Sequence, residues 1–423
     1  MSWLIILPIM FLFMLLNMRI YLSMLAAIVI YFLFFNQIPF AIAVQRLVSP
    51  AQNSTLLAIP FFILLGTLLS HTGVAERILR VANLLVGRFR GGMAMANITM
   101  STLMGGVSAS NLADAAMLSK MMVPEMERQG YNRAFAAAVT AAGSLVTPII
   151  PPGIALIIYG MVADVSIGKM FMAGILPGIL CAVMLMVAVW CIAKARNYKP
   201  MLTEWPKPKE LGEATLSAWP AFFVLIGVIG GIRANIFTPT EAGAAGVALV
   251  TFIGFVIYKQ MRVRHVVEAL HSTAKSTASI MLVIMASSAL AWIFSLEHAG
   301  IGVANWISSI TTNKYLFLAA LNILLLFLGM FIEGTALIII LVPLLKPLML
   351  QMGIDPVHFG LIIILNLSIG TFTPPVGTVM LLVCNITKVS MMDFLKESIP
   401  LLIALLITLA LVTYFPIISL LLT

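Results

Sequence analysis

The stretch Gly143-Ser144-Leu145-Val146-Thr147-Pro148-Ile149-Ile150-Pro151-Pro152 interrupts an apolar run that extends over 134–163. It has a counterpart in the second half of the chain, Asn366-Leu367-Ser368-Ile369-Gly370-Thr371-Phe372-Thr373-Pro374-Pro375, inside the apolar run 358–386. Proline removes a backbone donor and frees the carbonyl four residues earlier, and glycine permits unwinding. Both stretches therefore predict a helix that breaks inside an apolar segment.

The repeat extends beyond these two breaks. At the constant offset that aligns Pro151-Pro152 with Pro374-Pro375, further Gly, Pro and Phe residues recur without a gap. The matched pairs are Gly106 and Gly329, Pro124 and Pro347, Gly130 and Gly353, Phe171 and Phe394, and Pro177 and Pro400. Matching Gly and Pro are stronger evidence than matching Leu, because each constrains the backbone. The pattern predicts two repeats, 1–200 and 218–423, joined by a polar linker at 201–217.

The composition excludes a soluble fold. Of the 423 residues, 62% are hydrophobic and 9% are charged, and the mean hydropathy is +1.12. Soluble domains carry about 25% charged residues. The net charge of +9 comes from short clusters of Lys and Arg between apolar segments, so no basic face is long enough to bind nucleic acid. We therefore expect an all-α, multi-pass membrane protein whose main surroundings are lipid.

Ten apolar runs are long enough to cross a bilayer, which takes about 20 residues. They are 2–17, 20–40, 54–70, 134–163, 170–193, 218–235, 240–258, 279–296, 358–386 and 398–420. Two further stretches, 91–123 and 315–348, are apolar but contain Gly and polar residues near their middles. These predict re-entrant hairpins, because non-helical backbone at that depth must be buried in protein or face a water-filled cavity.

The positive charges predict the orientation. With the N-terminus outside, ten crossings place 19 of the 24 Lys and Arg residues on the cytoplasmic side, as the positive-inside rule requires. The five outward cations are Arg46, Lys169, Arg233, Lys314 and Lys346. The first hairpin then opens to the cytoplasm and the second to the outside. Inverted repeats with interrupted helices are typical of secondary transporters, whose site lies where the broken helices meet.

Polar residues gather at the hairpin tips. The first tip reads Gly105-Gly106-Val107-Ser108-Ala109-Ser110-Asn111, with Asp114 one turn further on, and the second reads Gly329-Met330-Phe331-Ile332-Glu333-Gly334-Thr335. Hydroxyls and freed carbonyls suit a small hard cation, and helix N-termini favour an anionic ligand. Asp114 and Glu333 are functional candidates because intramembrane carboxylates are costly. The alternative is structural, since such side chains also bond backbone carbonyls or neighbouring helices.

Enzyme signatures are absent from the sequence. It contains no H-E-x-x-H, no G-x-S-x-G and no phosphate-binding loop. The three cysteines form no C-x-x-C pair. We therefore expect no enzyme activity and no cofactor.

Two longer motifs carry a family resemblance. They are Gly230-Gly231-Ile232 with Phe237-Thr238-Pro239-Thr240-Glu241-Ala242, and Gly353-Ile354-Asp355-Pro356-Val357-His358-Phe359-Gly360. Together with Pro148-Ile149-Ile150-Pro151-Pro152 and Thr373-Pro374-Pro375-Val376-Gly377, they resemble the large membrane subunit, of the DctM or SiaM type, of tripartite ATP-independent periplasmic (TRAP) transporters. The resemblance covers essentially the whole chain.

The resemblance implies a sodium-coupled importer of the bacterial inner membrane that works by an elevator motion. Its substrate would be an organic acid, such as sialic acid, another sugar acid or a C4-dicarboxylate. A soluble periplasmic binding protein would deliver that acid. A small four-helix membrane subunit would support the scaffold near the short amphipathic segment 72–90 and the first two spans. Na+ would act as the coupling ion.

The resemblance also implies two sodium sites. The first would use Ser108, Ser110 and Asn111 with Gly143, Val146 and Pro148, and the second Glu333, Gly334 and Thr335 with Gly370 and Thr373. The candidate substrate-binding residues are Asp114, Ser144, Pro152, Asn366 and Thr371. Two other functions stay open from the residues alone: a stand-alone sodium-coupled dicarboxylate or anion carrier of the same superfamily, and a membrane scaffold that transports nothing.

Overall fold

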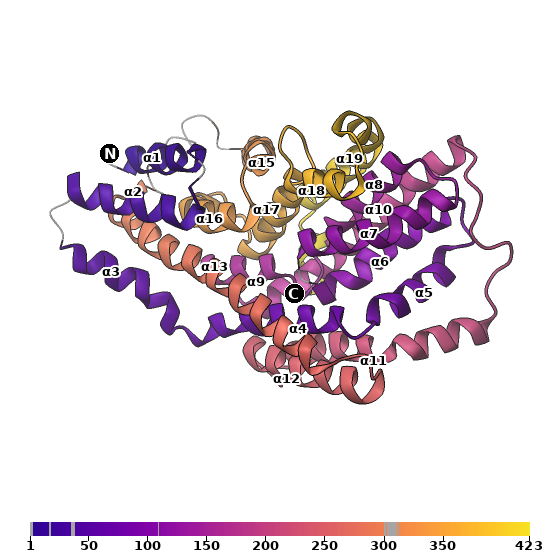
Figure 1. Cartoon of the computed structure of the whole chain (residues 1–423). Coiled ribbons are helices and arrows are strands. Elements are labelled where there is room, and N and C mark those ends of the chain that lie inside the picture. Colours follow the sequence, from indigo (N-terminus) through magenta and orange to yellow (C-terminus); the bar gives the residue numbers. More distant parts are fainter. Residues whose placement is uncertain are drawn as a thin grey trace.

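The computed structural model describes residues 3–16, 18–34, 39–108, 110–299, 302, 311 and 313–423. Helices form nearly all of the regular structure, and no β-strand occurs in these ranges (Figure 1). Helices are the natural form of such apolar segments, because lipid offers their backbone groups no hydrogen-bond partner. The prediction of an all-α polytopic membrane protein is confirmed.

The helices divide at the polar segment that follows residue 195. Before it lie α1 (Trp3–Leu15), α2 (Ile20–Phe34), α3 (Phe40–Val48), η1 (Ser49–Gln52), η2 (Ser54–Leu57), α4 (Ala58–Ser70), α5 (Val74–Val86), α6 (Gly92–Ser108), α7 (Asn111–Arg128), α8 (Arg133–Ser144), α9 (Ile154–Val162) and α10 (Ile167–Ala195). After it lie α11 (Pro208–Arg233), α12 (Pro239–Phe252), η3 (Ile253–Ile257), α13 (Val263–Leu296), α15 (Lys314–Gly329), α16 (Gly334–Gln351), α17 (Pro356–Gly370), α18 (Thr378–Thr387), α19 (Met391–Tyr414) and α20 (Ile417–Leu420).

Six of the described helices are each long and apolar enough to cross a membrane, and a bent pair adds a seventh candidate. The bent pair joins Phe40–Gln52 to Ser54–Ser70 at an angle of 54°. The predicted runs 134–163 and 358–386 are each divided into two shorter helices, α8 with α9 and α17 with α18. The number of crossings, and the side on which each end lies, stay predictions.

Two predicted boundaries differ from the structure. The run 279–296 is only the end of α13, which has 34 residues and begins at Val263. A hydropathy pattern detects only the apolar part of α13, whereas the first turns of this helix are polar and can lie outside the bilayer. The linker predicted at 201–217 is shorter, because α11 begins at Pro208, where a proline suits the first helical position. The span predicted at 54–70 agrees with the segment Ser54–Ser70, which follows α3 and η1 after a bend.

The internal repeat is visible in the helix boundaries. Helices α7 and α16 begin at Asn111 and Gly334, and α8 and α17 begin at Arg133 and Pro356, both pairs at the same offset that aligns the two breaks. The second arm of each hairpin packs on the broken helix of the other half: α7 contacts α18, and α16 contacts α9. The two repeats therefore interlock at the tips and breaks. Their opposite orientation across the membrane stays a prediction.

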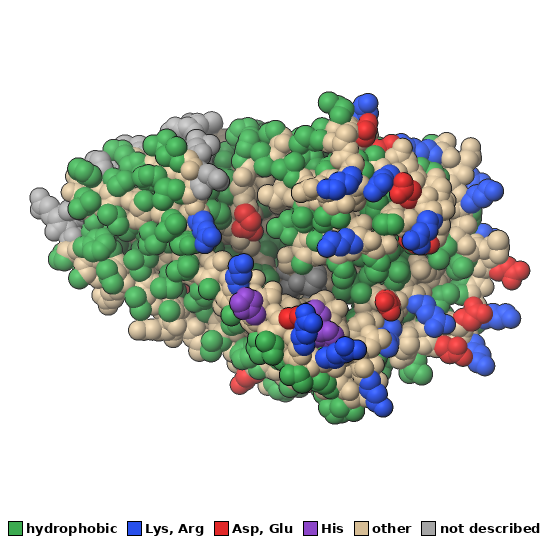
Figure 2. All heavy atoms as spheres, in the orientation of Figure 1, with side chains coloured by type: hydrophobic (Ala, Val, Ile, Leu, Met, Phe, Trp, Pro, Cys, Tyr) green, Lys and Arg blue, Asp and Glu red, His purple; other side chains and the backbone are tan. Residues whose placement is uncertain are grey.

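The helices around the tips and breaks form two groups. Helices α6–α9 and α15–α18, here called the tip–break unit, carry both hairpins and both broken helices. Helices α2–α5 and α11–α13, here called the frame, lie beside it: α13 packs against α2, α3, α4 and α16, and crosses the front of the molecule (Figure 1). Figure 2 shows mostly hydrophobic side chains over α1–α3, with charged side chains gathered toward the opposite end.

Candidate functional site

A cavity of about 780 Å³ lies where the two hairpin tips, the two helix breaks and the frame meet. The first tip contributes Ser110, Asn111 and Leu112, and the second contributes Glu333, Gly334 and Thr335. Pro148 comes from the first break and Thr371 from the second. The structure therefore brings together seven of the predicted site residues, Ser110, Asn111, Pro148, Glu333, Gly334, Thr335 and Thr371.

The first tip begins helix α7. Ser110 is its N-cap, with an extended backbone, and its hydroxyl oxygen accepts a hydrogen bond from the amide of Ala113 at 3.4 Å. The side-chain amide of Asn111 donates to the hydroxyl oxygen of Thr371 at 3.5 Å, which joins the first tip to the second break. Ser108 is the last residue of α6, and its side chain lies outside the described residues.

The second tip begins helix α16 in the same manner. Glu333 is the N-cap, and its carboxylate accepts a hydrogen bond from the amide of Ala336 at 3.2 Å and another from the hydroxyl of Thr335. Two helix N-termini thus face one cavity. Because the first amides of a helix carry a partial positive charge, the N-terminus of α7, capped by the neutral Ser110, favours a bound anion, whereas the carboxylate of Glu333 already occupies that of α16.

Each break is a tight turn whose carbonyl oxygen atoms accept hydrogen bonds. In the first, the amide of Val146 donates to the carbonyl of Gly143, and that of Ile149 donates to the carbonyl of Val146, both at 3.1 Å. In the second, the amide of Thr373 donates to the carbonyl of Gly370 at 3.1 Å. A carbonyl oxygen has two lone pairs, so those of Gly143 and Gly370 keep acceptor capacity. The peptide bonds Pro151-Pro152 and Pro374-Pro375 are both cis.

Gly370 permits the close approach of a tip to a break. A Cβ atom added at Gly370 would lie 2.7 Å from backbone atoms of Gly329, at the end of the first arm of the second hairpin. The amide of Gly377 donates to the carbonyl of Met330 at 3.0 Å and fixes the same junction. A larger side chain at Gly370 would push the tip away from the break.

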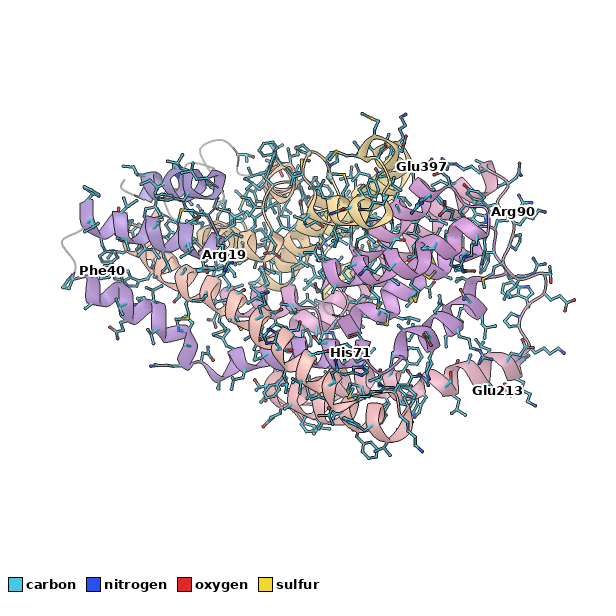
Figure 3. The ribbon with its side chains drawn as sticks, viewed as in Figure 1. Arg19, Phe40, His71, Arg90, Glu213 and Glu397 are labelled. Atoms are coloured by element: carbon cyan, nitrogen blue, oxygen red, sulfur yellow. The ribbon has the colours of Figure 1, made fainter. Side chains whose placement is uncertain are left out.

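Two cations line the cavity from outside the tip–break unit. Arg19 comes from the turn before α2, and Lys275 comes from α13. Figure 3 places Arg19 at the start of α2, above α13. Among the described lining residues Glu333 is the one carboxylate, and the hydroxyls of Ser276 and Ser279 complete the polar wall of α13. The wall is therefore net positive, which favours an anionic ligand. Sequence reasoning did not select these cations, because no motif marks them.

Four of the five substrate candidates lie away from this cavity. Asp114 is fully buried, and one carboxylate oxygen accepts from the hydroxyl of Thr147 at 3.1 Å. The side-chain amide of Asn366 donates to the side-chain oxygen of Asn322 at 2.8 Å. Ser144, buried at the end of α8, donates its hydroxyl to the carbonyl of Ala141 at 2.8 Å. Asp114 and Asn366 therefore join segments within one repeat, Ser144 bonds within α8, and Pro152 is buried at the first break.

Asn322 and His358 are buried polar residues that the sequence reading did not place in the interior. The side-chain amide of Asn322 donates to the hydroxyl of Thr413 at 3.0 Å. His358 lies within 3.3 Å of the hydroxyl oxygen of Ser419 and 3.2 Å of the carbonyl of Thr413. Asn322 therefore attaches α15 to α19, and His358 attaches α17 to both α19 and α20. The sequence around Asn322 and His358 does not predict these contacts, because the partners are distant in the chain.

Comparison with known proteins identifies the family. The sequence model of the tripartite ATP-independent periplasmic transporter DctM component matches residues 7–418. The chain is 40% identical over 382 residues to the sialic acid TRAP transporter large permease protein SiaM of Vibrio cholerae, covering 90% of this chain and 88% of that one. It is 34% identical to the C4-dicarboxylate TRAP transporter large permease protein DctM of Pseudomonas aeruginosa, covering 89% and 87%.

Solved structures resemble the fold at lower sequence identity. The YdaH transporter of Alcanivorax borkumensis superposes with a TM-score of 0.56 at 14% identity, covering 89% of this chain and 88% of that one. MtrF of Neisseria gonorrhoeae superposes with a TM-score of 0.53 at 12% identity, covering 90% and 84%. The resemblance drawn from the sequence motifs is confirmed. The chain belongs to the DctM family: it is the large permease protein of a TRAP transporter, a multi-pass inner-membrane protein and not an enzyme.

Proposed function

We propose that this permease imports an organic acid by sodium-coupled transport and that the 780 Å³ cavity is its transport site. The observation that carries the proposal is the meeting of both tips and both breaks on one cavity with two cations in its wall. The candidate substrates are sialic acid, another sugar acid and a C4-dicarboxylate. Relatives are named for sialic acid, C4-dicarboxylates and 2,3-diketo-L-gulonate, all of which carry a carboxylate.

The charge of the cavity supports an acid as substrate. Arg19 and Lys275 provide full positive charges, and the N-terminus of α7 provides a partial one. A cavity of this size holds a ligand as large as a sugar acid, since ligand sites of about 300–1,000 Å³ are usual. Apolar residues such as Ile338 and Leu367 also line the cavity, so the carboxylate of the substrate would be the main group that the cavity recognises.

The tips and breaks offer the oxygen atoms that a sodium ion needs. The first site would draw on Ser110 and Asn111 with the carbonyls of the first break. The second would draw on Glu333 and Thr335 with the carbonyls and hydroxyls of the second break. Hard cations select carboxylate, carbonyl and hydroxyl oxygen atoms, and no cluster of three or more His, Cys, Asp or Glu residues occurs in the described chain. Coupling arises if Na+ fixes each tip against its break before the acid binds.

The division into two groups of helices supports an elevator mechanism. The tips and breaks belong to the tip–break unit, whereas Arg19 and Lys275 belong to α2, its preceding turn and α13. Movement of the tip–break unit along the frame would carry the site to the other side of the membrane. Broken helices near the midplane of inverted repeats are the arrangement in which alternating access of this kind is found.

Two partners complete the proposed system. A small four-helix membrane subunit would bind the frame, near α1, α2 and α5. A periplasmic binding protein would deliver the acid to the outer ends of the hairpins and of the frame. Docking would have to favour the outward-facing state, because a ligand shifts an equilibrium only by its differential affinity for the two states.

Uptake by reconstituted vesicles tests the proposal. The permease is reconstituted alone, with the small subunit, and with both the small subunit and the binding protein, under an imposed sodium gradient. We expect uptake of the acid only in the complete system and only with sodium outside. Robust sodium-driven uptake by the permease alone would identify a stand-alone carrier instead. No uptake in any combination, with an acid that the binding protein binds, would contradict the proposed function.

A further inference from the structure

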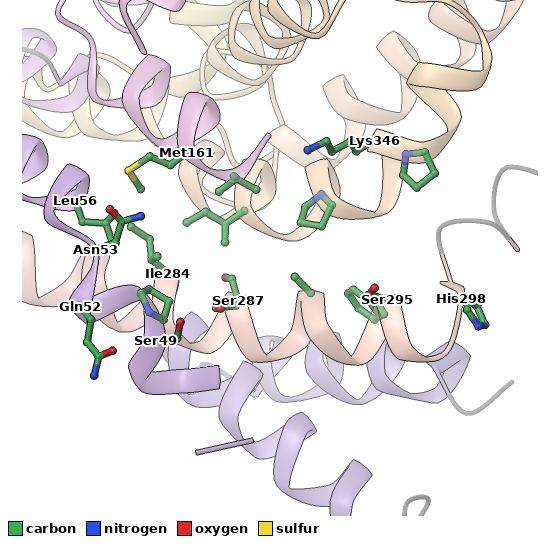
Figure 4. A pocket seen from close by; sticks show the side chains of 18 residues that line it. Ser49, Gln52, Asn53, Leu56, Met161, Ile284, Ser287, Ser295, His298 and Lys346 are labelled. Atoms are coloured by element: carbon green, nitrogen blue, oxygen red, sulfur yellow. The ribbon is translucent and has the colours of Figure 1, made fainter. Parts of the chain in front are cut away.

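A second cavity, of about 720 Å³, lies further along the hairpin arm α16. Its two walls come from different groups of helices. The frame contributes η1 and one face of α13, and the tip–break unit contributes α16 with Pro343, Lys346 and Pro347. Figure 4 shows Lys346 on the opposite wall of the cavity from Ser287 and Ser295 of α13. We call this the outer cavity and the transport site described above the inner cavity.

The cavities are called inner and outer because of the predicted sides of the cations that line each cavity. Arg19 and Lys275, at the inner cavity, are among the cations that the positive-inside pattern places in the cytoplasm. Lys346, at the outer cavity, is one of the five that it places outside. Among the described residues Lys346 forms no ion pair, and none of those lining the outer cavity is acidic. The outer cavity therefore also suits an anion.

One face of α13 lines both cavities. Toward the inner cavity it presents Lys275, Ser276, Ser279, Ile280 and Val283. Toward the outer cavity it presents Ile284, Ser287, Ser288, Ala291, Phe294 and Ser295. The spacing of three and four residues makes this a single stripe along the helix. Small hydroxyl side chains occupy both ends of the stripe, and bulky aliphatic side chains occupy its middle.

The middle of the stripe meets a buried isoleucine of α16. Ile339 lines both cavities, and only 2% of its surface is exposed. Opposite it, Val283 lines the inner cavity and Ile284 lines the outer one. Val283 and Ile284 are consecutive residues of α13 that face different cavities, and Ile339 of α16 faces both. The layer that separates the two cavities is therefore about one side chain thick.

We propose that the two cavities are the inner and outer ends of one route along α13, over which the tip–break unit carries an organic anion, and that an apolar layer of Val283, Ile284 and Ile339 separates them in this structure. An apolar constriction stops ions because they cannot cross it without losing their hydration. The hydroxyls and Lys346 of the outer end make it the place where the acid meets the permease from outside. The identity of the anion rests on the proposed function; the apolar layer does not.

A leak assay tests the layer without any substrate. Purified permease is reconstituted into vesicles with a chloride gradient, and collapse of the gradient is followed with a chloride-sensitive dye, because both cavities are lined by cations. Ile339→Ala should collapse the gradient at least about tenfold faster than wild type, because it joins the two water-filled cavities. Ile340→Ala is the matched control: Ile340 is the next residue of α16, is equally buried at 3% exposed, and lines neither cavity.

Ile284→Ala provides an independent variant from the opposite wall. If Ile339→Ala and Ile284→Ala both elute as monodisperse protein and leak no faster than Ile340→Ala, the layer does not exist. The assay needs neither sodium coupling nor partners. If the proposed function is wrong, the leak of Ile339→Ala is still expected. If the apolar layer does not exist, sodium-coupled uptake by the complete system can still be measured.

Cysteine labelling tests the two ends of the route. In a background in which Cys181, Cys191 and Cys384 are replaced, Ser288→Cys should react with a membrane-impermeant thiol reagent added outside. Ser276→Cys should react with the same reagent only from the inside. Adding Ile339→Ala should let the inside reagent reach Ser288→Cys. Labelling of both cysteines from the same side in the wild-type background would overturn the assignment of two separate ends.

Discussion

Asn111 and Thr371 come from different halves of the sequence, yet the side-chain amide of one lies 3.5 Å from the hydroxyl oxygen of the other. Asn111 is the first residue of α7, at the first hairpin tip, and Thr371 follows α17 at the second break. The hydroxyl of Thr371 also donates to the carbonyl of Ser368 at 2.7 Å. The pair therefore connects the two repeats at the wall of the inner cavity.

This contact should affect transport more than stability. At 3.5 Å the hydrogen bond is long, and such a bond contributes at most about 1 kcal/mol. We expect Asn111→Ala and Thr371→Val each to lower uptake while leaving the thermal unfolding temperature within about 3 °C of wild type. The double variant should lose no more uptake than the less active of the two single variants. Multiplicative losses in the double variant would mean that the two side chains act independently.

The cations of the inner cavity should recognise the carboxylate of the substrate. Removing one charge-assisted contact costs about 1–3 kcal/mol, which is a roughly 5- to 150-fold loss of affinity. Lys275→Gln should therefore weaken binding of the acid by at least about fivefold, as measured by calorimetry on purified permease. Arg264→Gln is the control, because Arg264 lies on the same helix but pairs with Glu268 at 2.7 Å and lines neither cavity. Equal affinities in both variants would remove Lys275 from the site.

Both termini should face the periplasm. The reason is the distribution of Lys and Arg, most of which lie on the cytoplasmic side if the chain crosses the membrane ten times. One crossing more or fewer would place the C-terminus on the other side. A reporter enzyme that is active only in the cytoplasm, fused after Thr423, should be silent. The same reporter placed in the polar segment after residue 195 is the positive control. Strong activity at Thr423 would require one crossing more or fewer.

The stability of the frame should depend on pH through His71. Its ring stacks on that of His265, with centroids 5.0 Å apart, beside α13 (Figure 3). Burial, followed by the charge of His265, lowers the pKa of His71 below its usual 6.5, although Glu268 acts in the opposite direction. The folded protein then binds this proton less readily than the unfolded chain. The associated stability is complete above about pH 6.5 and is lost as the pH falls below it.

Thermal unfolding at about pH 7.5 and 5.5 measures this contribution. His71→Gln should show a smaller drop in unfolding temperature between the two conditions than wild type. His271→Gln, an exposed histidine further along α13, should keep the wild-type drop. The same drop in all three proteins would show that His71 does not contribute.

The parts of the fold that depend on local backbone chemistry could be predicted from the sequence. Pro148 and Pro374, with their glycines, marked both breaks, and the constant offset between the repeats matches the starts of α7 and α16. Which polar side chains turn toward the cavity could not be predicted. Asn366 bonds to Asn322, and Asp114 bonds to Thr147, because these partners meet only after the helices pack. Arg19 and Lys275 were missed for the same reason.

Binding of the coupling sodium ions by oxygen atoms at the tips and breaks is the main part of the proposed function. It is tested most directly by the sodium concentration that gives half-maximal uptake in the complete reconstituted system. The hydroxyl of Thr373 donates to the carbonyl of Ile369 at 2.8 Å, and that of Thr408, in α19, donates to the carbonyl of Ala404 at the same distance. The two threonines differ in location but not in this bond, so Thr408→Ala is a matched control for Thr373→Ala.

We predict that Thr373→Ala and Ser110→Ala each raise this sodium concentration by roughly 5- to 150-fold, since each removes one contact to an ion. Thr408→Ala should leave it at the wild-type value. Wild-type sodium dependence in both Thr373→Ala and Ser110→Ala would contradict the assignment of the coupling sites to the tips and breaks.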